Sequence, residues 1–523
     1  MKEKKSAWSS INKRTFLPPA ILTVLITLVG IIAPSQLGKA MNAALNWCTK
    51  YWGWLYALGS FLLVVFCIAI CISKYGKIKL GGKDAKPEMS FFKWFSIVLT
   101  SGMAAGLCYW SVAEPMNFFQ NPPGFSGLEG GSAQAAEMVL RYSFIHWTLH
   151  PYAIYTSVGV ALGFMYWNAK RPFSVSSALY PMLGKKANGP LQYWINAACI
   201  FCLVAGLGTT LGLAIDQLSS GLNFITGKSF DLTKVGFAVC LMFAVIAILA
   251  ACTGLHKGVA FISTANMYMF IVLLVFAFIF GGTLFIINNT VSSVGQYFQF
   301  LPSQSLYLEP AQQTGWVNSW TIFYLAWWLA FAPLIGLFQI KLSKGRTIRQ
   351  YIIVNMFVPC IFLVLWFGTF GSSAIQMELN GSTGISQALA EFGNSVAFFA
   401  YLKELPASAI TIIVAVVAVI FSIVTQTEAE VLTISDLCMK DEGGESESDK
   451  HSPAPIKIFW GLIMSLLAFA LLYSGGLDAV QTASIVLGLP MLILILVMCV
   501  SSLKGFRHYK EYDKTLEPGD DYE

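Results

Sequence analysis

The stretch WVNSWTIFYLAWWLAFAP (316–333) contains no charged side chain, and the uncharged run continues to residue 340. A helix that crosses the hydrocarbon core of a bilayer needs about 20 predominantly apolar residues. Trp316 and Trp320 suit an interfacial aromatic belt. Trp327 and Trp328 lie about 12–18 Å deeper, at roughly 1.5 Å of rise per residue. This run therefore predicts a membrane span, and its deep tryptophan pair indicates either a binding pocket or close helix packing.

The rest of the chain has the same character. Of 523 residues, 56% are hydrophobic and 11% are charged, whereas soluble chains carry about 25% charged residues. These values exclude a set of soluble domains, a disordered chain and a fibrous repeat. We predict an all-α integral membrane protein with about twelve transmembrane helices, by the same length rule. The predicted spans are 17–36, 52–74, 90–119, 137–167, 190–222, 233–253, 257–287, 316–340, 348–375, 405–434, 454–474 and 480–503.

Lysine and arginine gather in alternate connecting segments. Residues 2–14, 74–86 and 504–514 are rich in them, whereas the loops 120–136 and 288–315 contain none. By the positive-inside rule, both termini are predicted to be cytoplasmic. The basic charge then faces anionic lipid, and no nucleic-acid partner is needed to explain it.

The segment SGMAAGLCYWSVAEP (101–115) interrupts its span with small residues. Gly102 and Gly106 allow either close packing against another helix or a local unwinding that frees carbonyls for a cation. Glu114 and Asp216 are ionisable groups within predicted spans, a placement that is costly and usually functional.

Aromatic side chains surround a proline in HWTLHPYAIY (146–155). Trp147, Tyr152 and Tyr155 fall near one helical face, where they form either a core stripe or a cage for a quaternary ammonium through cation–π attraction. His146 and His150 have metal-like spacing but lack the glutamate of HExxH. No metal site is therefore predicted, and interhelical hydrogen bonding is expected from these histidines.

Polar groups also occur in FSIVTQTEAE (421–430), at the end of an apolar run. Thr425, Thr427 and Glu428 either serve a function inside the membrane or mark the point where the helix emerges into the cytoplasm. The chain contains no HExxH and no GxSxG motif, so we do not expect an enzyme.

Taken together, these segments resemble the betaine/choline/carnitine transporter family over nearly the whole chain. The motifs that carry the resemblance are HWTLHP (146–151), AWW within 320–333, LSKGRTIRQ (342–350) and GLHKGV (254–259). The resemblance implies a bacterial inner (plasma) membrane protein, a homotrimer, and the LeuT-like fold of two inverted five-helix repeats.

The resemblance also divides the chain into segments. The cytoplasmic N-tail covers 1–16, two peripheral helices cover 17–74, and the first repeat covers 90–287. The segment 288–315 is expected to be an extracytoplasmic amphipathic connector. The second repeat covers 316–503, and a cytoplasmic C-tail covers 504–523.

The resemblance implies that this chain contains the family's aromatic box, a set of aromatic side chains that holds the cationic head group of the substrate. The resemblance implies that the substrate is a small methylated ammonium compound, and that secondary transport proceeds by alternating access. Tyr152 stands where many members have tryptophan, and Phe331 stands where tryptophan or tyrosine is frequent. These departures leave the named substrate open, and a pocket poor in donors suits a ligand without a carboxylate. The expected substrate-binding residues are Trp147, Tyr152, Tyr155, Trp327, Trp328, Phe331 and Ala104.

The coupling ion is expected to be sodium, with no other cofactor. Asn266 occupies the position at which sodium-independent exchangers of the family have arginine. Glu428 keeps proton coupling open, and sodium-independent exchange is the other alternative. The expected ion-binding residues are Thr425, Thr427, Met103 and Thr209.

Overall fold

The computed structural model describes residues 10–253, 258–440, 452–517 and 521–522. Side chains are described at all of these positions except 103–105, 247, 250–253, 258–260 and 475–481. Within these ranges the chain is helical and forms no β-sheet, apart from two isolated bridges. The predicted all-α class is therefore confirmed for the described residues.

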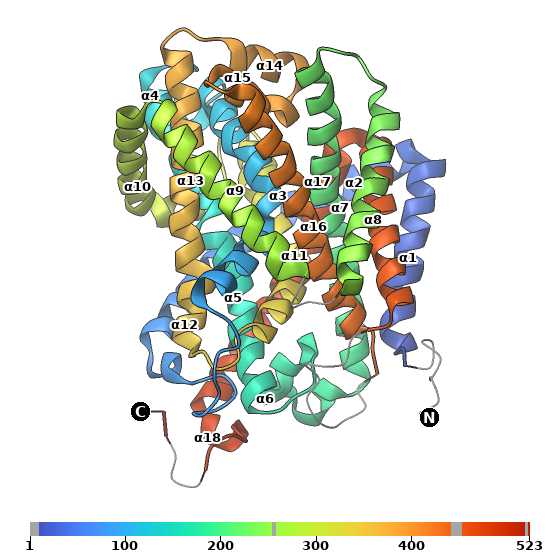
Figure 1. Ribbon diagram of the computed structural model, residues 1–523. Coiled ribbons are helices and arrows are strands. Elements are labelled where there is room, and N and C mark those ends of the chain that lie inside the picture. The colour runs from blue at the N-terminus through green and yellow to red at the C-terminus, as the bar shows by residue number, and fades with distance from the viewer. Residues whose placement is uncertain (1–9, 254–257, 441–451, 518–520, 523) are drawn as a thin grey trace.

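Most of the chain lies in long helices joined by short segments (Figure 1). The α-helices are α1 (Lys13–Ile32), α2 (Pro34–Ile72), α3 (Phe91–Gln120), α4 (Ala133–Trp147), α5 (Leu149–Gly163), α6 (Tyr180–Leu183), α7 (Pro190–Thr226), α8 (Leu232–Thr253), α9 (Gly258–Phe280), α10 (Thr283–Ser305), α11 (Phe323–Lys341), α12 (Ile348–Ile352), α13 (Val358–Leu379), α14 (Gly384–Phe392), α15 (Ala397–Glu404), α16 (Ser408–Leu437), α17 (Ala454–Arg507) and α18 (Tyr509–Tyr512). Three π-helical turns, η4 (Phe164–Asn168), η7 (Asn318–Ile322) and η8 (Ile353–Phe357), adjoin α5, α11 and α13. Five short 3₁₀ segments complete the set: η2 (Lys74–Lys77), η3 (Gly124–Ser126), η5 (Val175–Leu179), η6 (Gly184–Asn188) and η9 (Asn394–Val396).

In the described part of the chain, nine helices are long and apolar enough to cross a membrane, or ten if the bent helix α3 counts as one span. The predicted span 137–167 is divided into α4 and α5. The predicted span 233–253 is helical throughout, as α8. A multi-span membrane protein is therefore confirmed, whereas twelve spans and an inverted repeat stay predictions.

The last two predicted spans lie in one continuous helix, α17. Its 54 residues correspond to roughly 80 Å at 1.5 Å per residue, far more than a hydrocarbon core of about 30 Å. The helix contains two apolar stretches, Ala454–Ser474 and Thr482–Arg507. Each stretch is long enough for one crossing.

Helix α11 occupies the centre of the bundle. It packs against α5, α7, α16 and α17, and every side chain from Phe323 to Ile340 is buried. A helix that is apolar on all sides is stable only when it is enclosed. By contrast, α1 and α10 lie at opposite sides of the bundle and expose large apolar side chains (Figure 1).

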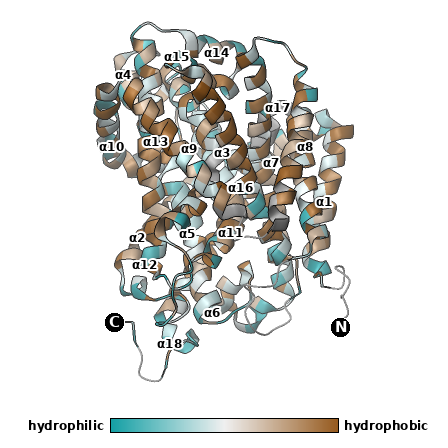
Figure 2. Ribbon diagram, in the orientation of Figure 1, coloured by the Kyte–Doolittle hydropathy of each residue, from teal (hydrophilic) through white to brown (hydrophobic). Residues whose placement is uncertain are grey.

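The basic segments predicted to be cytoplasmic meet at one end of the molecule. Leu80 donates its backbone N–H to Arg346, and the backbone of Lys514 donates to Asn168. Figure 2 shows hydrophilic residues near α6, α12 and α18, at the end where both termini lie. The described ends of the chain therefore share one side, as the distribution of lysine and arginine predicts.

Asn168, at the end of η4, ties the C-terminal tail to this end of the bundle. Its buried amide nitrogen donates to the carbonyl of Lys79 (3.0 Å), to Oδ2 of Asp513 (2.8 Å) and to the hydroxyl of Tyr522 (3.2 Å). Its amide oxygen accepts the N–H of Gly81 (3.2 Å). We call these contacts the Asn168 clamp.

Replacing Asn168 by alanine is expected to lower the apparent melting temperature of the purified protein in detergent. Each lost hydrogen bond costs about 1 kcal/mol, and the buried partners left unpaired add to this. The variant Asn188→Ala is the control, because the Asn188 side-chain oxygen has no hydrogen-bond partner among the described residues. An equal effect of the two substitutions would contradict the clamp.

Candidate substrate and ion site

The ring of Trp328, on α11, is surrounded by three of the predicted box residues. Its centroid lies 5.8 Å from the ring of Trp147, 5.8 Å from that of Tyr152 and 5.3 Å from that of Tyr155. The four side chains are fully buried, which excludes an interfacial belt for them. We call these four residues the ring cluster.

The chain folds around the ring cluster because the helix breaks after Trp147. Helix α4 ends at Trp147, Thr148 takes the non-helical angles φ −113° and ψ −109°, and α5 begins at Leu149. Pro151 lies in the first turn of α5, where it lacks the N–H that would otherwise bond to the carbonyl of Trp147. The break therefore precedes the proline, and it separates Trp147 from the face that carries Tyr152 and Tyr155.

Two other predicted box residues lie beside the cluster. Trp327 stacks on Phe323 (5.5 Å between centroids, 15° between planes), and its ring lies 6.5 Å from that of Trp147. The ring of Phe331 faces α7, where a Cβ built on Gly206 would lie 3.1 Å from it. The predicted residues Met103 and Ala104, and residues 254–257 of the GLHKGV motif, lie outside the residues whose side chains are described.

Helix α3 brings its glycines against the ring cluster. The axes of Phe91–Gly102 and Gly106–Gln120 differ by 64°, so the span is bent where the sequence predicts an interruption. Both parts belong to one helix, α3, and a local unwinding between them stays a prediction. A Cβ on Gly106 would lie only 2.7 Å from the Trp147 ring, whereas one on Gly102 would meet Tyr155 at 3.5 Å. Gly106 is therefore required for the close approach of Trp147.

Several polar groups at the cluster are available to a ligand. Among the described residues, the hydroxyls of Tyr152 and Tyr155 and the indole N–H of Trp327 are buried and have no hydrogen-bond partner. The sequence-based expectation of a donor-poor pocket is thus not met. Buried donors normally find partners, so these three can bond to a polar group of a substrate.

The predicted ion ligands occupy two separate places. Thr425 and Thr427 are buried on α16, where the Thr425 hydroxyl donates to the carbonyl of Phe421 (2.8 Å). Thr209, on α7, lies 2.7 Å from the hydroxyl of Ser484 on α17. Sequence reasoning missed Ser484, because nothing in the local pattern relates positions so far apart in the chain.

Helix α16 does not emerge into solvent at its polar segment. Glu428 and Glu430 are buried, and α16 continues to Leu437. These carboxyl groups are therefore enclosed by protein, and their depth in the membrane stays a prediction. The side chain of Asn266 donates to Ser422 (2.9 Å), one turn before Thr425 on the same helix, so Asn266 faces the predicted ion ligands.

Glu114 pairs with the segment that begins the ring cluster. Its Oε1 lies 2.8 Å from Nδ1 of His146, and its Oε2 accepts the indole N–H of Trp147 at 2.7 Å. Nε2 of His146 lies 3.0 Å from the hydroxyl of Thr321. The expected interhelical hydrogen bonding is confirmed for His146 but is wrong for His150, whose two ring nitrogens have no hydrogen-bond partner among the described residues. In the same part of the chain there is no group of three or more metal-ligating side chains.

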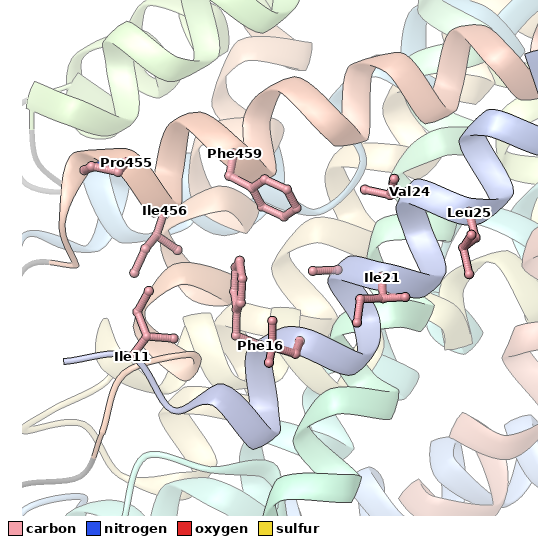
Figure 3. A pocket seen from close by; sticks show the side chains of 10 residues that line it. Ile11, Phe16, Ile21, Val24, Leu25, Pro455, Ile456 and Phe459 are labelled. Atoms are coloured by element: carbon pink, nitrogen blue, oxygen red, sulfur yellow. The ribbon is translucent and has the colours of Figure 1, made fainter. Parts of the chain in front are cut away.

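A separate cavity of about 490 Å³ lies between α1 and the start of α17 (Figure 3). Its lining is entirely apolar and consists of Ile11, Phe16, Leu17, Ala20, Ile21, Val24, Leu25, Pro455, Ile456 and Phe459. It shares no residue with the ring cluster and offers no polar group. The cavity is therefore distinct from the candidate substrate site.

The described residues thus form a bundle of helices long and apolar enough to cross a membrane, around a buried aromatic cluster. The family model described as "BCCT, betaine/carnitine/choline family transporter" matches residues 14–511 of this chain. The chain belongs to this family.

Characterised relatives extend along nearly the whole chain. It is 34% identical to the glycine betaine transporter OpuD of Bacillus subtilis, over 95% of this chain and 96% of the relative. It is 32% identical to the ectoine/hydroxyectoine transporter of Virgibacillus pantothenticus, over 94% and 96%. It is 30% identical to the osmo-dependent choline transporter BetT2 of Acinetobacter baylyi, over 95% and 71%.

Proposed function

We propose that this protein is a secondary active transporter of a small quaternary or methylated ammonium compound. The observation that carries the proposal is the ring cluster, in which three aromatic side chains surround Trp328 in the protein interior. The electron-rich faces of such rings attract a cation that has no N–H to donate, and the attraction grows when the cation is desolvated. Names of relatives support the same substrate class, since they include transporters of glycine betaine and of choline, which are both quaternary ammonium compounds.

In the proposed mechanism the cluster holds the ammonium head group near the middle of the membrane. Helices around α11 then expose this place to one side of the membrane at a time, in the manner of alternating access. The protein works in the bacterial inner membrane with both termini in the cytoplasm, and it assembles as a homotrimer. The two repeats at 90–287 and 316–503 supply the helices that move.

Uptake into proteoliposomes tests the proposal. Purified protein is reconstituted and offered labelled glycine betaine, choline, carnitine, ectoine and trimethylamine, each with and without an inward sodium gradient. Accumulation of at least one methylated ammonium compound is expected. Failure to bind or accumulate any of them, in vesicles with a verified gradient, would refute the function.

We further propose that uptake is coupled to sodium through hydroxyl groups close to Thr425. Sodium prefers oxygen ligands, and the buried hydroxyl of Thr425 lies about one turn beyond Ser422, which bonds to Asn266, while buried Thr427 follows two residues later. Asn266 carries no positive charge that could stand in for the ion. Proton coupling through Glu428, or sodium-independent exchange, is the alternative.

Replacing Thr425 by alanine is expected to raise the sodium concentration needed for half-maximal uptake by about tenfold, the loss of one hydroxyl ligand being comparable to a charge-assisted hydrogen bond. The matched variant Glu428→Gln is expected to keep sodium-driven uptake largely intact. Initial uptake rates measured against sodium concentration check both expectations. Full uptake in sodium-free potassium buffer, abolished by collapse of a pH gradient, would replace sodium by proton coupling.

A further inference from the structure

Glu114 is a completely buried carboxylate next to the ring cluster. Both of its oxygens bond to consecutive residues at the end of α4, Oε1 to His146 (2.8 Å) and Oε2 to Trp147 (2.7 Å). Trp147, the member of the ring cluster that contacts Glu114, is thus held to α3 by a hydrogen bond between side chains. A buried charge is costly unless it is fully hydrogen-bonded, so this arrangement calls for a function.

One hydrogen bond of the group has a direction fixed by its chemistry. An indole N–H can only donate, so Oε2 accepts from Trp147. With Nδ1 of His146 protonated, that ring nitrogen donates to Oε1, and Nε2 accepts the hydroxyl hydrogen of Thr321 at 3.0 Å. In this tautomer the imidazole of His146 and the indole of Trp147 both donate to the Glu114 side chain.

Glu114 also acts, through His146, on Trp328, the second tryptophan of the ring cluster. The backbone carbonyl of His146 accepts the indole N–H of Trp328 at 3.1 Å, and the His146 ring stacks on Tyr324, with centroids 4.7 Å apart and planes at 19°. Glu114 therefore holds Trp147 directly and holds Trp328 through His146. The two indole rings meet nearly at right angles, at 82°.

We propose that Glu114 is a positioning residue for substrate recognition, which fixes the orientation of the Trp147 ring and enriches its electron density. A carboxylate that accepts the indole N–H makes a charge-assisted hydrogen bond, roughly twice as strong as a neutral one. In a low-dielectric interior such a bond polarises its donor, which strengthens the attraction of the ring for a cation. This inference rests on the proposed function and adds a residue that does not touch the substrate.

Binding measurements on Glu114→Gln in the full-length protein test the inference. The glutamine has the same size, but its amide oxygen can accept only one of the two donors well, and its NH₂ group opposes the other. The affinity for the labelled compound that the wild type transports is expected to fall about tenfold, the usual effect of losing a hydrogen bond to a charged group. The Michaelis constant is expected to rise with it, while the maximal rate changes less.

A double-mutant cycle with Trp147→Phe separates positioning from general stability. Phenylalanine keeps a ring face but has no N–H, so Glu114→Gln is expected to have much less effect in this background than in the wild type. Equal effects in both backgrounds would overturn the inference. Trp147→Phe alone removes the same hydrogen bond by deleting its donor instead of its acceptor. Wild-type affinity in that variant would also overturn the inference, and this test remains available if Glu114→Gln does not fold.

Glu309→Gln is the matched control. Glu309 is another buried carboxylate, which accepts hydrogen bonds from Thr314 (2.9 Å), Gly315 (2.9 Å) and Val317 (3.1 Å) in the segment before η7. Its substitution is expected to leave substrate affinity unchanged. If it weakens binding as much as Glu114→Gln does, the effect is a general loosening and the inference fails. If the wild type binds no methylated ammonium compound, the proposed function itself is refuted. If the wild type binds such a compound and the effects of Glu114→Gln and Trp147→Phe are additive, only the role of Glu114 is refuted.

Discussion

Replacing Trp328 by leucine is expected to weaken substrate binding by about tenfold or more, because one ring of a desolvated box contributes roughly 1–2 kcal/mol. Trp328 is the member of the ring cluster that contacts the other three rings. Leucine keeps an apolar side chain but has no ring face. The change also leaves the carbonyl of His146 without its indole donor. Equilibrium binding of the transported compound to purified protein measures the effect.

Two companion variants interpret this result. Trp328→Phe keeps a ring but loses the N–H, so its affinity is expected to fall between those of the wild type and the leucine variant. Trp460→Leu removes an equally buried tryptophan that packs on Phe16 near the start of α17 and is no member of the cluster. It is expected to lower stability without changing affinity. Unchanged binding in Trp328→Leu would exclude the ring cluster as the substrate site.

A leucine in place of Gly106 is expected to abolish transport while the protein still inserts into the membrane. Even the Cβ of alanine would lie 2.7 Å from the Trp147 ring, a distance that real side chains do not tolerate. Trp147 is enclosed by Phe367 at 4.9 Å and by Trp328, and its indole is held by Glu114. The ring therefore has to leave its place, and overpacking of this kind costs about 1–3 kcal/mol or more.

Gly102 provides the control for this prediction, four residues earlier on the same helix. A Cβ there would meet Tyr155 at 3.5 Å, an ordinary van der Waals contact. Gly102→Ala is therefore expected to retain most of its uptake, whereas Gly106→Ala loses most of it. Initial uptake rates, normalised to the amount of inserted protein, make the comparison. Normal rates in Gly106→Leu would mean that the close approach of Trp147 to α3 has no part in transport.

The local features of the site could be predicted because they depend on few residues. The depth of Trp328 in an uncharged run follows from helix rise alone, and its burial agrees. The aromatic face of α5 follows from the spacing of Tyr152 and Tyr155. The position of the helix break at Thr148 could not be derived in the same way, because a proline in the first turn allows the preceding helix to end at several residues.

Contacts between distant segments escaped prediction for a different reason. Glu114 was recognised as a costly group inside a span, but its partners lie on another helix, 32 and 33 positions later. The pairing of Thr209 with Ser484 spans 275 positions. Hydropathy records which residues avoid water and says nothing about which helix faces which. Among the residues that the structure describes, the hydroxyls of Tyr152 and Tyr155 have no partner. The sequence could not predict this, because the availability of a donor depends on all its neighbours in space.

The Asn168 clamp has a practical consequence for anyone who attaches a reporter to this protein. Tyr522, next to the last residue of the sequence, bonds to both Asn168 and Asp513. A bulky fluorescent fusion placed directly behind it would compete with those bonds. A long glycine-serine spacer between Tyr522 and the reporter is expected to leave these bonds undisturbed.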